Sequence, residues 1–394
     1  MRILVIGGDG YCGWATALHL SARGHDVTIV DNLIRRRWDA ELGITSLTRI
    51  APIESRLREW HERTSRTIAY LSRDVTVYED VCRTLRETRP HAIVHFGQQR
   101  SAPYSMIDHD HALRTHLNNT VGNLNLLWAL HEVAPEAHLV KLGTMGEYGT
   151  PNIDIEEGFI TIEHKGRTDT LPFPKQPGSF YHLTKVSDSD QIYFACRTWQ
   201  LRATDLNQGI VYGIETPETF LSAPLVNRFD YDGVYGTVLN RFCVQAALRH
   251  PLTVYGRGGQ TRAFLDIRDT VACIELAILN PAEPGEYRVF NQFTEVFGVL
   301  ALARRVEAVA RELGIKAPVL YYDNPRAEKD EHYYQTVNTR LMDLGLTPRH
   351  LDDALIAQLI EVGIRNVERI DPAHVLPKVK WRGAEPASAA ERAG

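Results

Sequence analysis

Short apolar runs of β type alternate with longer amphipathic stretches through the first 210 residues. Most of the runs end in glycine or polar residues. Such runs, separated by helical patterns, are typical of βαβ units built around a parallel sheet. The strands predicted in this way cover residues 3–6, 27–30, 67–71, 92–95, 138–142 and 202–206.

After Gly209 this alternation stops. Two prolines and an aromatic, aspartate-rich stretch at 229–233 indicate loops, and helical patterns return near 238–248 and 300–313. We therefore expect a doubly wound α/β (Rossmann) sheet in residues 1–210, with a helical excursion at 35–66. A smaller substrate-binding lobe, residues 211–382, is expected to interleave with the last sheet elements. The Ala-, Glu- and Ser-rich residues 383–394 are predicted to be disordered.

Charge and cysteine content exclude several classes of protein. The net charge of −5 argues against a nucleic-acid or anionic-membrane surface. The five cysteines are scattered and form no C-x-x-C pair, a pattern that favours reduced thiols in the cytoplasm over disulfides or a metal site. No run of about 18 apolar residues predicts a membrane span, and the first apolar run is too short for a signal peptide.

A glycine-rich turn follows the first predicted strand. Its sequence is GGDGYCG, residues 7–13, and a helix is predicted from about residue 14 to 23. The glycines permit a tight turn, close approach of the backbone to a pyrophosphate, and close packing of helix on strand. The helix N-terminus then presents unpaired N–H groups to the phosphates. This context predicts a dinucleotide site.

The second strand ends in Asp31, which fits a carboxylate that accepts hydrogen bonds from the adenosine ribose and favours NAD over NADP. Arg35, Arg36 and Arg37 complicate this prediction, because arginine near this strand can accept a 2′-phosphate. We weigh Asp31 more heavily and predict NAD. Asp74 and Val75 are placed to contact adenine or, as an equal alternative, to cap the next helix. The predicted cofactor contacts are Gly7, Gly10, Tyr11, Cys12, Asp31, Asn32, Arg35, Asp74, Val75, Phe96, Asn118, Tyr181 and Lys185.

Tyr181 and Lys185 stand four residues apart at a predicted helix start, so they share one face of the helix. A nearby ammonium lowers the pKa of a tyrosine, which lets the phenolate take a proton from a substrate hydroxyl. Lysine also reaches the nicotinamide ribose. Together with Thr144, just past the fifth strand, the pair predicts a reaction centre for hydride transfer.

These residues resemble the extended short-chain dehydrogenase/reductase superfamily, whose members modify nucleotide sugars. Within it the chain resembles the UDP-sulfoquinovose synthases from residue 1 to about 382. The stretches that carry the closer resemblance are FGQQRSAPYSM (96–106), LGTMGEYGTPNIDI (142–155), TDLNQG (204–209) and YGRGGQTR (255–262).

The resemblance implies that UDP-glucose and sulfite are the substrates and NAD the cofactor. The implied steps are oxidation at C4, loss of the C6 hydroxyl to give a 5,6-ene, addition of sulfite at C6, and reduction at C4. Related 4,6-dehydratases carry an Asp–Glu pair directly after the threonine, where this chain has Met145 and Gly146. We therefore expect the proton shuttles elsewhere, at Glu147 and His182; the alternative for His182 is a plain helix-surface position.

The substrate would also need positive and polar contacts. Arg100 is placed for sulfite at the edge of the site, with an ordinary loop salt bridge as an equal alternative. Arginine suits bidentate contact with the UDP pyrophosphate. The resemblance places the substrate contacts at Arg100, Thr144, Asn207, Gln208, Thr237, Asn240, Gln260, Arg262, Arg326 and Glu328.

Two other functions remain open from the residues. One is a related NAD-dependent enzyme, a UDP-sugar 4-epimerase or 4,6-dehydratase of a specialised pathway. The other is a non-catalytic sensor of NAD or nucleotide sugars, against which Thr144, Tyr181 and Lys185 argue. The superfamily resemblance also implies a homodimer formed through helices near residues 112–132 and 180–198. No metal, nucleic acid or membrane partner is expected.

Overall fold

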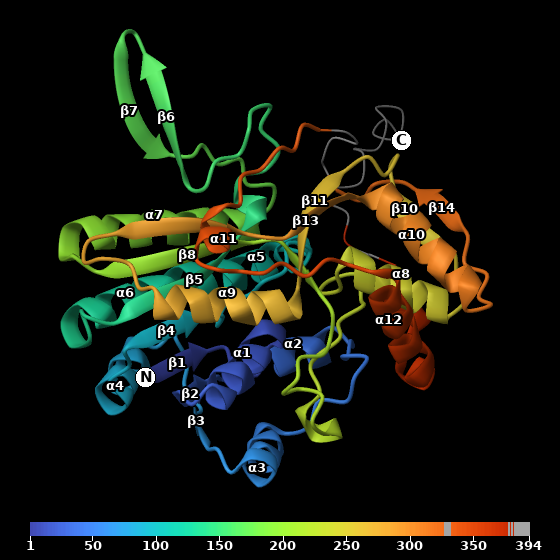
Figure 1. Ribbon diagram of the computed structural model, residues 1–394, viewed down its shortest axis with the longest axis horizontal. Helices are drawn as coiled ribbons and strands as arrows, with labels where there is room; N and C mark the ends of the chain where they lie inside the picture. Colours follow the sequence, from blue (N-terminus) through green and yellow to red (C-terminus); the bar gives the residue numbers. More distant parts are fainter. Residues whose placement is uncertain (327–331, 377–378, 380, 382–394) are drawn as a thin grey trace, which may run out of the picture.

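The computed structural model describes residues 1–326, 332–376, 379 and 381 (Figure 1). A parallel sheet of seven strands, in the order β12-β8-β5-β4-β1-β2-β3, forms its centre. All six strands predicted from the sequence are present, which confirms the doubly wound α/β fold. Their bounds are β1 (Arg2–Ile6), β2 (Asp26–Val30), β3 (Ile68–Leu71), β4 (Ala92–His95), β5 (His138–Thr144) and β8 (Arg202–Gln208). The seventh strand, β12 (Tyr287–Gln292), comes from the later part of the chain.

Helices cover both faces of the sheet. On one face, α1 (Tyr11–Ala22) and α9 (Ile267–Leu279) pack on apolar side chains of β1, β2 and β4. On the other, α4 (Tyr78–Thr88), α6 (Gly122–Val133) and α7 (Phe180–Trp199) bury the alternate side chains of the same strands. Because both faces are covered, the strands are continuous apolar runs. Helix α5 (His109–His116) leads into α6 through a π-helical turn, Leu117–Val121.

The segment from residue 35 to 66 contains two helices, α2 (Ile34–Glu41) and α3 (Ile53–Thr64). Trp60 and Ile53 of α3 join the core beneath α1, so this segment packs on the sheet domain. Arg56, on the same helix, is fully buried.

A second lobe gathers around its own core. It holds the sheet β13-β11-β9, the parallel pair β10-β14 and three helices. After β8 the chain leaves the main sheet, returns for α9 and β12, and leaves it again, so the two parts interleave. The elements are β9 (Ile210–Tyr212), β10 (Leu252–Tyr255), β11 (Thr261–Asp266), β13 (Glu295–Gly298), β14 (Val319–Tyr322), α8 (Val238–Ala247), α10 (Val299–Glu312) and α12 (Asp353–Arg365), with the short α11 (Arg340–Asp343) packed on β12.

A hairpin that the sequence pattern did not indicate, β6 (Phe159–His164) and β7 (Arg167–Pro172), projects from the body between β5 and α7 (Figure 1). Residues 383–394, predicted to be disordered, lie outside the described residues. Within the described part of the chain no helix is long and apolar enough to cross a membrane. All five cysteines are free thiols.

Candidate active site

The glycine-rich turn between β1 and α1 leaves no room for a side chain at Gly7 or Gly13. A Cβ on Gly7, whose φ is +82°, would lie 2.6 Å from the backbone nitrogen of Gly97, and one on Gly13 would lie 2.1 Å from the oxygen of Gly7. Gly10 caps α1 with no side-chain hydrogen bond. The first N–H groups of α1 are therefore left for a ligand, as a pyrophosphate requires.

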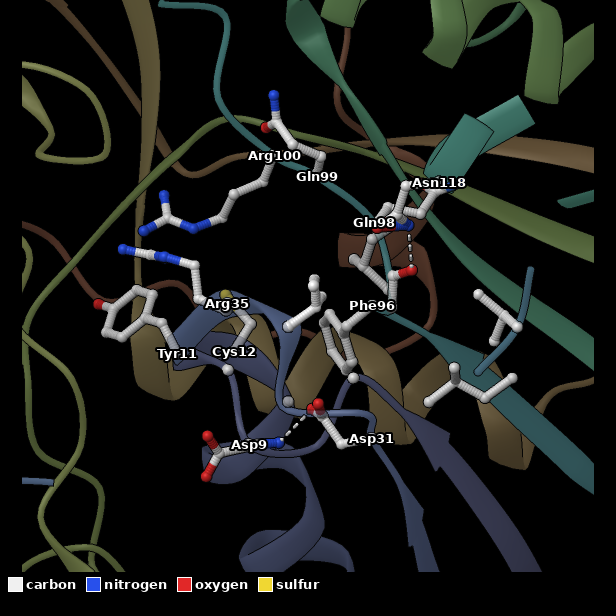
Figure 2. Close-up of a pocket in the computed structure, with 18 of the residues that line it drawn as sticks. Asp9, Tyr11, Cys12, Asp31, Arg35, Phe96, Gln98, Gln99, Arg100 and Asn118 are labelled. Atoms are coloured by element: carbon white, nitrogen blue, oxygen red, sulfur yellow. Dashed lines mark hydrogen bonds between the residues drawn. The ribbon is translucent and has the colours of Figure 1, made fainter. Parts of the chain in front are cut away.

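An open cavity begins at this turn and runs across the carboxyl ends of the strands (Figure 2). Gly7, Gly10, Tyr11 and Cys12 form its floor, and Tyr181 and Lys185 lie in its wall. Of the predicted cofactor residues, Asp74 alone does not line it. The others along the wall are Asp31, Asn32, Arg35, Val75, Phe96 and Asn118.

Asp31 is set up to bind a diol. Its Oδ2 accepts from the backbone N–H of Asp9 at 2.9 Å, and its Oδ1 accepts from that of Leu33 at 2.8 Å. Burial raises the pKa of Asp31 to about 6. Asp74 is not the cap of α4, which begins after Val77; instead its Oδ2 accepts from the Asn32 amide at 2.7 Å. The turn, Asp31 and the open helix N-terminus fit NAD.

The three consecutive arginines have different partners. Arg36 makes two hydrogen bonds of 2.7 Å to Asp9, and Arg37 donates to the backbone oxygen of Asn32. Arg35 turns toward the second lobe: its Nε lies 2.9 Å from Asp39, and its guanidinium lies 3.5 Å over the Tyr235 ring. Arg36 is therefore already paired where a 2′-phosphate would need it, which agrees with NAD.

Thr144, Tyr181 and Lys185 are brought together by β5 and α7. Thr144 is at the end of β5, near enough to Tyr181 to lower the pKa of its phenol. Ser179 caps α7 by accepting from the His182 N–H, which places Tyr181 in the first turn. The Lys185 ammonium donates to the backbone oxygen of Leu142 at 2.6 Å and to the Gln98 side chain. Its pKa is lowered to about 8 by burial and by Lys141.

The pKa of Tyr181 differs from the expectation. Burial raises it well above that of a free phenol, and Glu147 raises it further, whereas Lys141 and Arg100 lower it. The positive charges that favour the phenolate in this chain are thus Lys141 and Arg100, residues that lie far from Tyr181 in sequence.

Glu147 was expected to be a proton shuttle, but its side chain is fully buried beneath the site and does not line the cavity. Its carboxylate accepts from the Thr144 N–H and pairs with Lys141 and Lys175. Although burial raises its pKa, these lysines lower it to about 2. A carboxylate held ionised under the floor is unsuited to exchange protons with a sugar, and the expectation for Glu147 is therefore corrected.

Neither Met145 nor His182 is among the residues that line the cavity. Met145 is buried against Tyr148, Phe173 and Phe293. The His182 ring lies 5.1 Å from that of Tyr181, between ring centres, and its Nδ1 is 3.0 Å from the Ser179 hydroxyl. A Cβ on Gly146 would come within 2.3 Å of its Nε2. His182 thus fills the space next to Thr144 that a side chain at 146 would occupy.

Arg100 lines the cavity at the same end as Arg35, and the two side chains extend toward one another (Figure 2). Its guanidinium is 2.5 Å from Asp230, which also pairs with Arg35 at 3.3 Å. Arg100 thus makes the loop salt bridge and also faces the cavity, and its contact with sulfite stays a prediction.

The remaining predicted substrate residues are spread over both lobes. Gln208 lines the cavity, but the Asn207 side chain donates to Tyr148 and borders a separate small cavity with Lys175. At the start of α8, Thr237 Oγ1 and Asn240 Oδ1 are buried without a hydrogen-bond partner among the described residues. Gln260 donates to the backbone oxygen of Tyr255. Arg262 donates to that of Thr261, and Arg326 lies 5.4 Å from the Trp381 ring. Glu328 lies outside the described residues.

Several cavity residues escaped the sequence analysis. Gln98 ties Lys185 to Asp188, and Tyr235 and Trp38 close the end near Arg35. Gln98 follows a predicted strand directly, so its place at the carboxyl edge was a usable signal. Tyr235 lies in a loop far along the chain, and no sequence signal indicated its place in the cavity.

Residues 3–291 match the model of the NAD dependent epimerase/dehydratase family. The chloroplastic UDP-sulfoquinovose synthase of Spinacia oleracea is 57% identical over 97% of this chain and 79% of its own length. The UDP-sulfoquinovose synthase of Sulfolobus acidocaldarius is 43% identical, over 97% and 98% of the two chains.

Among solved structures, the UDP-glucose-4-epimerase of Stenotrophomonas maltophila with bound NAD has a TM-score of 0.69. It is 18% identical and covers 94% of this chain and 99% of its own. A likeness at this identity shows the fold alone.

Proposed function

Because the chain belongs to the NAD dependent epimerase/dehydratase family, we propose that it converts UDP-glucose and sulfite into UDP-sulfoquinovose. It is an NAD-dependent enzyme that modifies a nucleotide sugar. The observation that carries the proposal is the pair of acid–base groups side by side, Tyr181 and His182. An epimerase needs one base at C4, whereas elimination across C5 and C6 needs a second.

NAD, when bound, accepts a hydride from C4 of the sugar and later returns it. Tyr181 takes the proton of the C4 hydroxyl, and Thr144, near the same phenol, would orient that hydroxyl. Lys185, fixed by Leu142 and Gln98, would supply a positive charge to the bound cofactor. In the return step Tyr181 would give its proton back to the C4 oxygen as the hydride returns to C4.

His182 removes the C5 proton, which the C4 ketone has made acidic. The electron pair of the C5–H bond forms the C5–C6 double bond as the C6–O bond breaks, and the hydroxyl leaves as water after protonation. The sulfur lone pair of sulfite next forms a bond to C6, and the C5 carbon takes back a proton. Histidine suits both the removal of the C5 proton and its return to C5, because the ordinary pKa of histidine lies near neutrality.

Sulfite is an anion, and Arg100 supplies the positive charge at the cavity end opposite Asp31 (Figure 2). Its salt bridge to Asp230 fixes the guanidinium but leaves the side chain 39% exposed. An incoming anion can therefore share it.

The UDP end of the substrate lies toward the second lobe in this proposal. Thr237 and Asn240 offer buried polar atoms that await partners, which suits a ligand with many hydrogen-bonding groups. Gln208, Gln260, Arg262 and Arg326 complete the proposed contacts.

We also propose a homodimer. Large apolar side chains are exposed at every third or fourth position along the helical stretch 109–133, and others flank them on α7. Such a stripe on a helix marks a partner surface. It comprises Leu113, Leu117, Val121, Leu124 and Trp128, with Phe180, Leu183 and Phe194 beside it.

Free thiols in all five cysteines favour a reducing compartment such as the cytoplasm.

Incubation of the holoenzyme with UDP-glucose, with and without sulfite, tests the function by mass spectrometry. A sulfonated UDP-hexose that forms only with sulfite is expected. An isobaric C4 epimer seen by NMR, with sulfite unused, would show a 4-epimerase instead. A free 4-keto-6-deoxy sugar would show a dehydratase, and an unchanged substrate would show a sensor.

A further inference from the structure

Charged side chains without contact to the cavity lie directly beneath the catalytic residues. Lys141 on β5, Asp205 on β8 and Glu147 after β5 have exposures of 0–1%. Ser189 on α7 hydrogen-bonds both acids, and Lys175 reaches Glu147 from the preceding loop. We call these five residues, Lys141, Lys175, Glu147, Ser189 and Asp205, the buried cluster.

Within the cluster, the Lys141 ammonium has close polar partners. Its ammonium lies 3.0 Å from Asp205, 3.3 Å from Glu147 and 3.0 Å from the Ser189 hydroxyl. Ions this deep persist only when they are paired in this way. The cluster is therefore a fixed arrangement of charges.

The cluster also contacts the catalytic residues themselves. The Glu147 carboxylate accepts from the Thr144 N–H at 3.3 Å and so holds the turn that presents the Thr144 hydroxyl. Lys141 donates to the backbone oxygen of Lys185 at 3.4 Å, and the Ser189 hydroxyl oxygen lies 3.2 Å from the same oxygen. The cluster therefore contacts the backbone of both Thr144 and Lys185.

Its two central charges act on Tyr181 with opposite sign. The negative Glu147 raises the pKa of Tyr181, and the positive Lys141 lowers it. On Lys185 the same two residues also oppose one another, since Lys141 lowers its pKa and Glu147 raises it. In a site of low dielectric, fixed charges act over longer distances than in water.

Other charged groups face this pair as well. Arg100 lowers the pKa of Tyr181 from the cavity side. Asp188, held by Gln98, raises that of Lys185 from its own helix, as does Asp205 from β8. His95 on β4 faces Lys185 but is neutral, because burial lowers its pKa to about 3. His182 lies beside the Tyr181 ring.

We infer that Lys141 and Glu147 are positioning residues that set, with opposite sign, how readily Tyr181 gives up its proton. They act from beneath the floor, touch neither substrate nor cofactor, and work through Thr144 and Lys185. The inference rests on the proposed function only in taking Tyr181 as the base at C4.

The test compares Lys141→Met, Glu147→Gln and the double variant as holoenzymes. Each is labelled with ¹³C-tyrosine, and the Tyr181 phenol is identified by its loss in Tyr181→Phe. Lys141→Met should raise the titration midpoint of that phenol by about one unit, and Glu147→Gln should lower it by about one unit. The double variant should lie between the two. The pH profile of cofactor reduction by UDP-glucose should move in the same directions.

The control is Asp269→Asn, which removes a buried acid of α9 paired with Arg349, outside the cluster. It should cost stability without moving the Tyr181 midpoint. Shifts of equal sign in both single variants, or no shift in Glu147→Gln, would overturn the inference. If Lys141→Met does not fold, the shift of the Tyr181 midpoint in Glu147→Gln alone decides whether the inference holds. Opposed phenol shifts in the two single variants, together with no reaction of the wild-type enzyme with UDP-glucose, would refute the proposed function and leave the inference intact.

Discussion

The imidazole of His182 lies where a side chain at Gly146 would have to go, because a Cβ there would come within 2.3 Å of its Nε2. Glycine at 146 and histidine at 182 therefore depend on one another. The ring can occupy this position only because residue 146 has no side chain.

Gly146→Ala should displace His182 and slow removal of the C5 proton. We expect exchange of that hydrogen with solvent deuterium, followed by NMR, to fall about tenfold or more. Reduction of the cofactor by UDP-glucose should change little, since Tyr181 and Lys185 stay in place. Gly298→Ala is the control, because a Cβ there meets nothing within 4 Å. Normal exchange in Gly146→Ala would remove His182 from its proposed role.

NAD affinity should rise with pH through about 6. Burial raises the pKa of Asp31 to about 6, so the carboxyl is protonated below this pH and ionised above it. Only the ionised form accepts hydrogen bonds from both ribose hydroxyls. Fluorescence titration of the cofactor-free protein should show NAD binding strengthen by about tenfold between about pH 5 and pH 8. Asp31→Asn should bind weakly at every pH; a pH step that survives in this variant would assign it to another group.

Arg100→Gln should raise the KM for sulfite about 10- to 100-fold, because a charge-assisted contact to the anion is lost. The KM for UDP-glucose should change far less. Steady-state assays that vary each substrate in turn measure both. Arg73 lines the same cavity but is bound to Glu87 at 2.6 Å, so Arg73→Gln serves as the control. Equal effects of the two substitutions on sulfite would argue for a general loss of positive charge.

Asp9→Asn should destabilise the protein by about 3–5 kcal/mol, since it leaves the buried guanidinium of Arg56 without its anionic partner. Arg56 has no exposed side-chain surface and lies 3.7 Å over the Trp14 ring. Urea unfolding measures the loss, and Asp9→Asn with Arg56→Met should recover much of it. Glu59→Gln, which breaks a surface pair on the same helix, should have little effect. No recovery in the double variant would place the cost with Arg36.

Trp128→Glu should convert the proposed dimer into monomers, because it places a charge in the exposed apolar stripe on α6. Light scattering after size exclusion should report a fall from twice the chain mass to the chain mass. Phe220→Glu alters an even more exposed side chain, 72% accessible, in a loop outside the stripe. This control should stay dimeric; dissociation of both variants would mean that the stripe is not the interface.

Elements whose signals are local could be predicted from the amino-acid sequence alone. Six strands, the glycine turn and Asp31 were predicted because periodicity, glycine and a strand end are all features of a few neighbouring residues. Tyr181 and Lys185 share a face for the same reason, since i, i+4 spacing on a helix guarantees it. The superfamily followed from the glycine turn and the reaction-centre residues, and the family model over residues 3–291 confirmed it. The closer resemblance followed from stretches of loop sequence, and relatives 57% and 43% identical confirmed it.

The directions of side chains whose partners are far away along the chain became known only from the folded structure. Glu147 was predicted to act in the cavity, yet it faces downward because Lys141 and Lys175 stabilise its charge there. Arg35 and Arg36 are neighbours in sequence, but their partners differ. Arg36 binds Asp9, whereas Arg35 binds Asp230, which lies 195 positions further along the chain. Strand β12 completes the main sheet from within the later segment, and its register with β8 is set by long-range pairing. Such pairings depend on the packing of whole elements, which local sequence patterns do not encode.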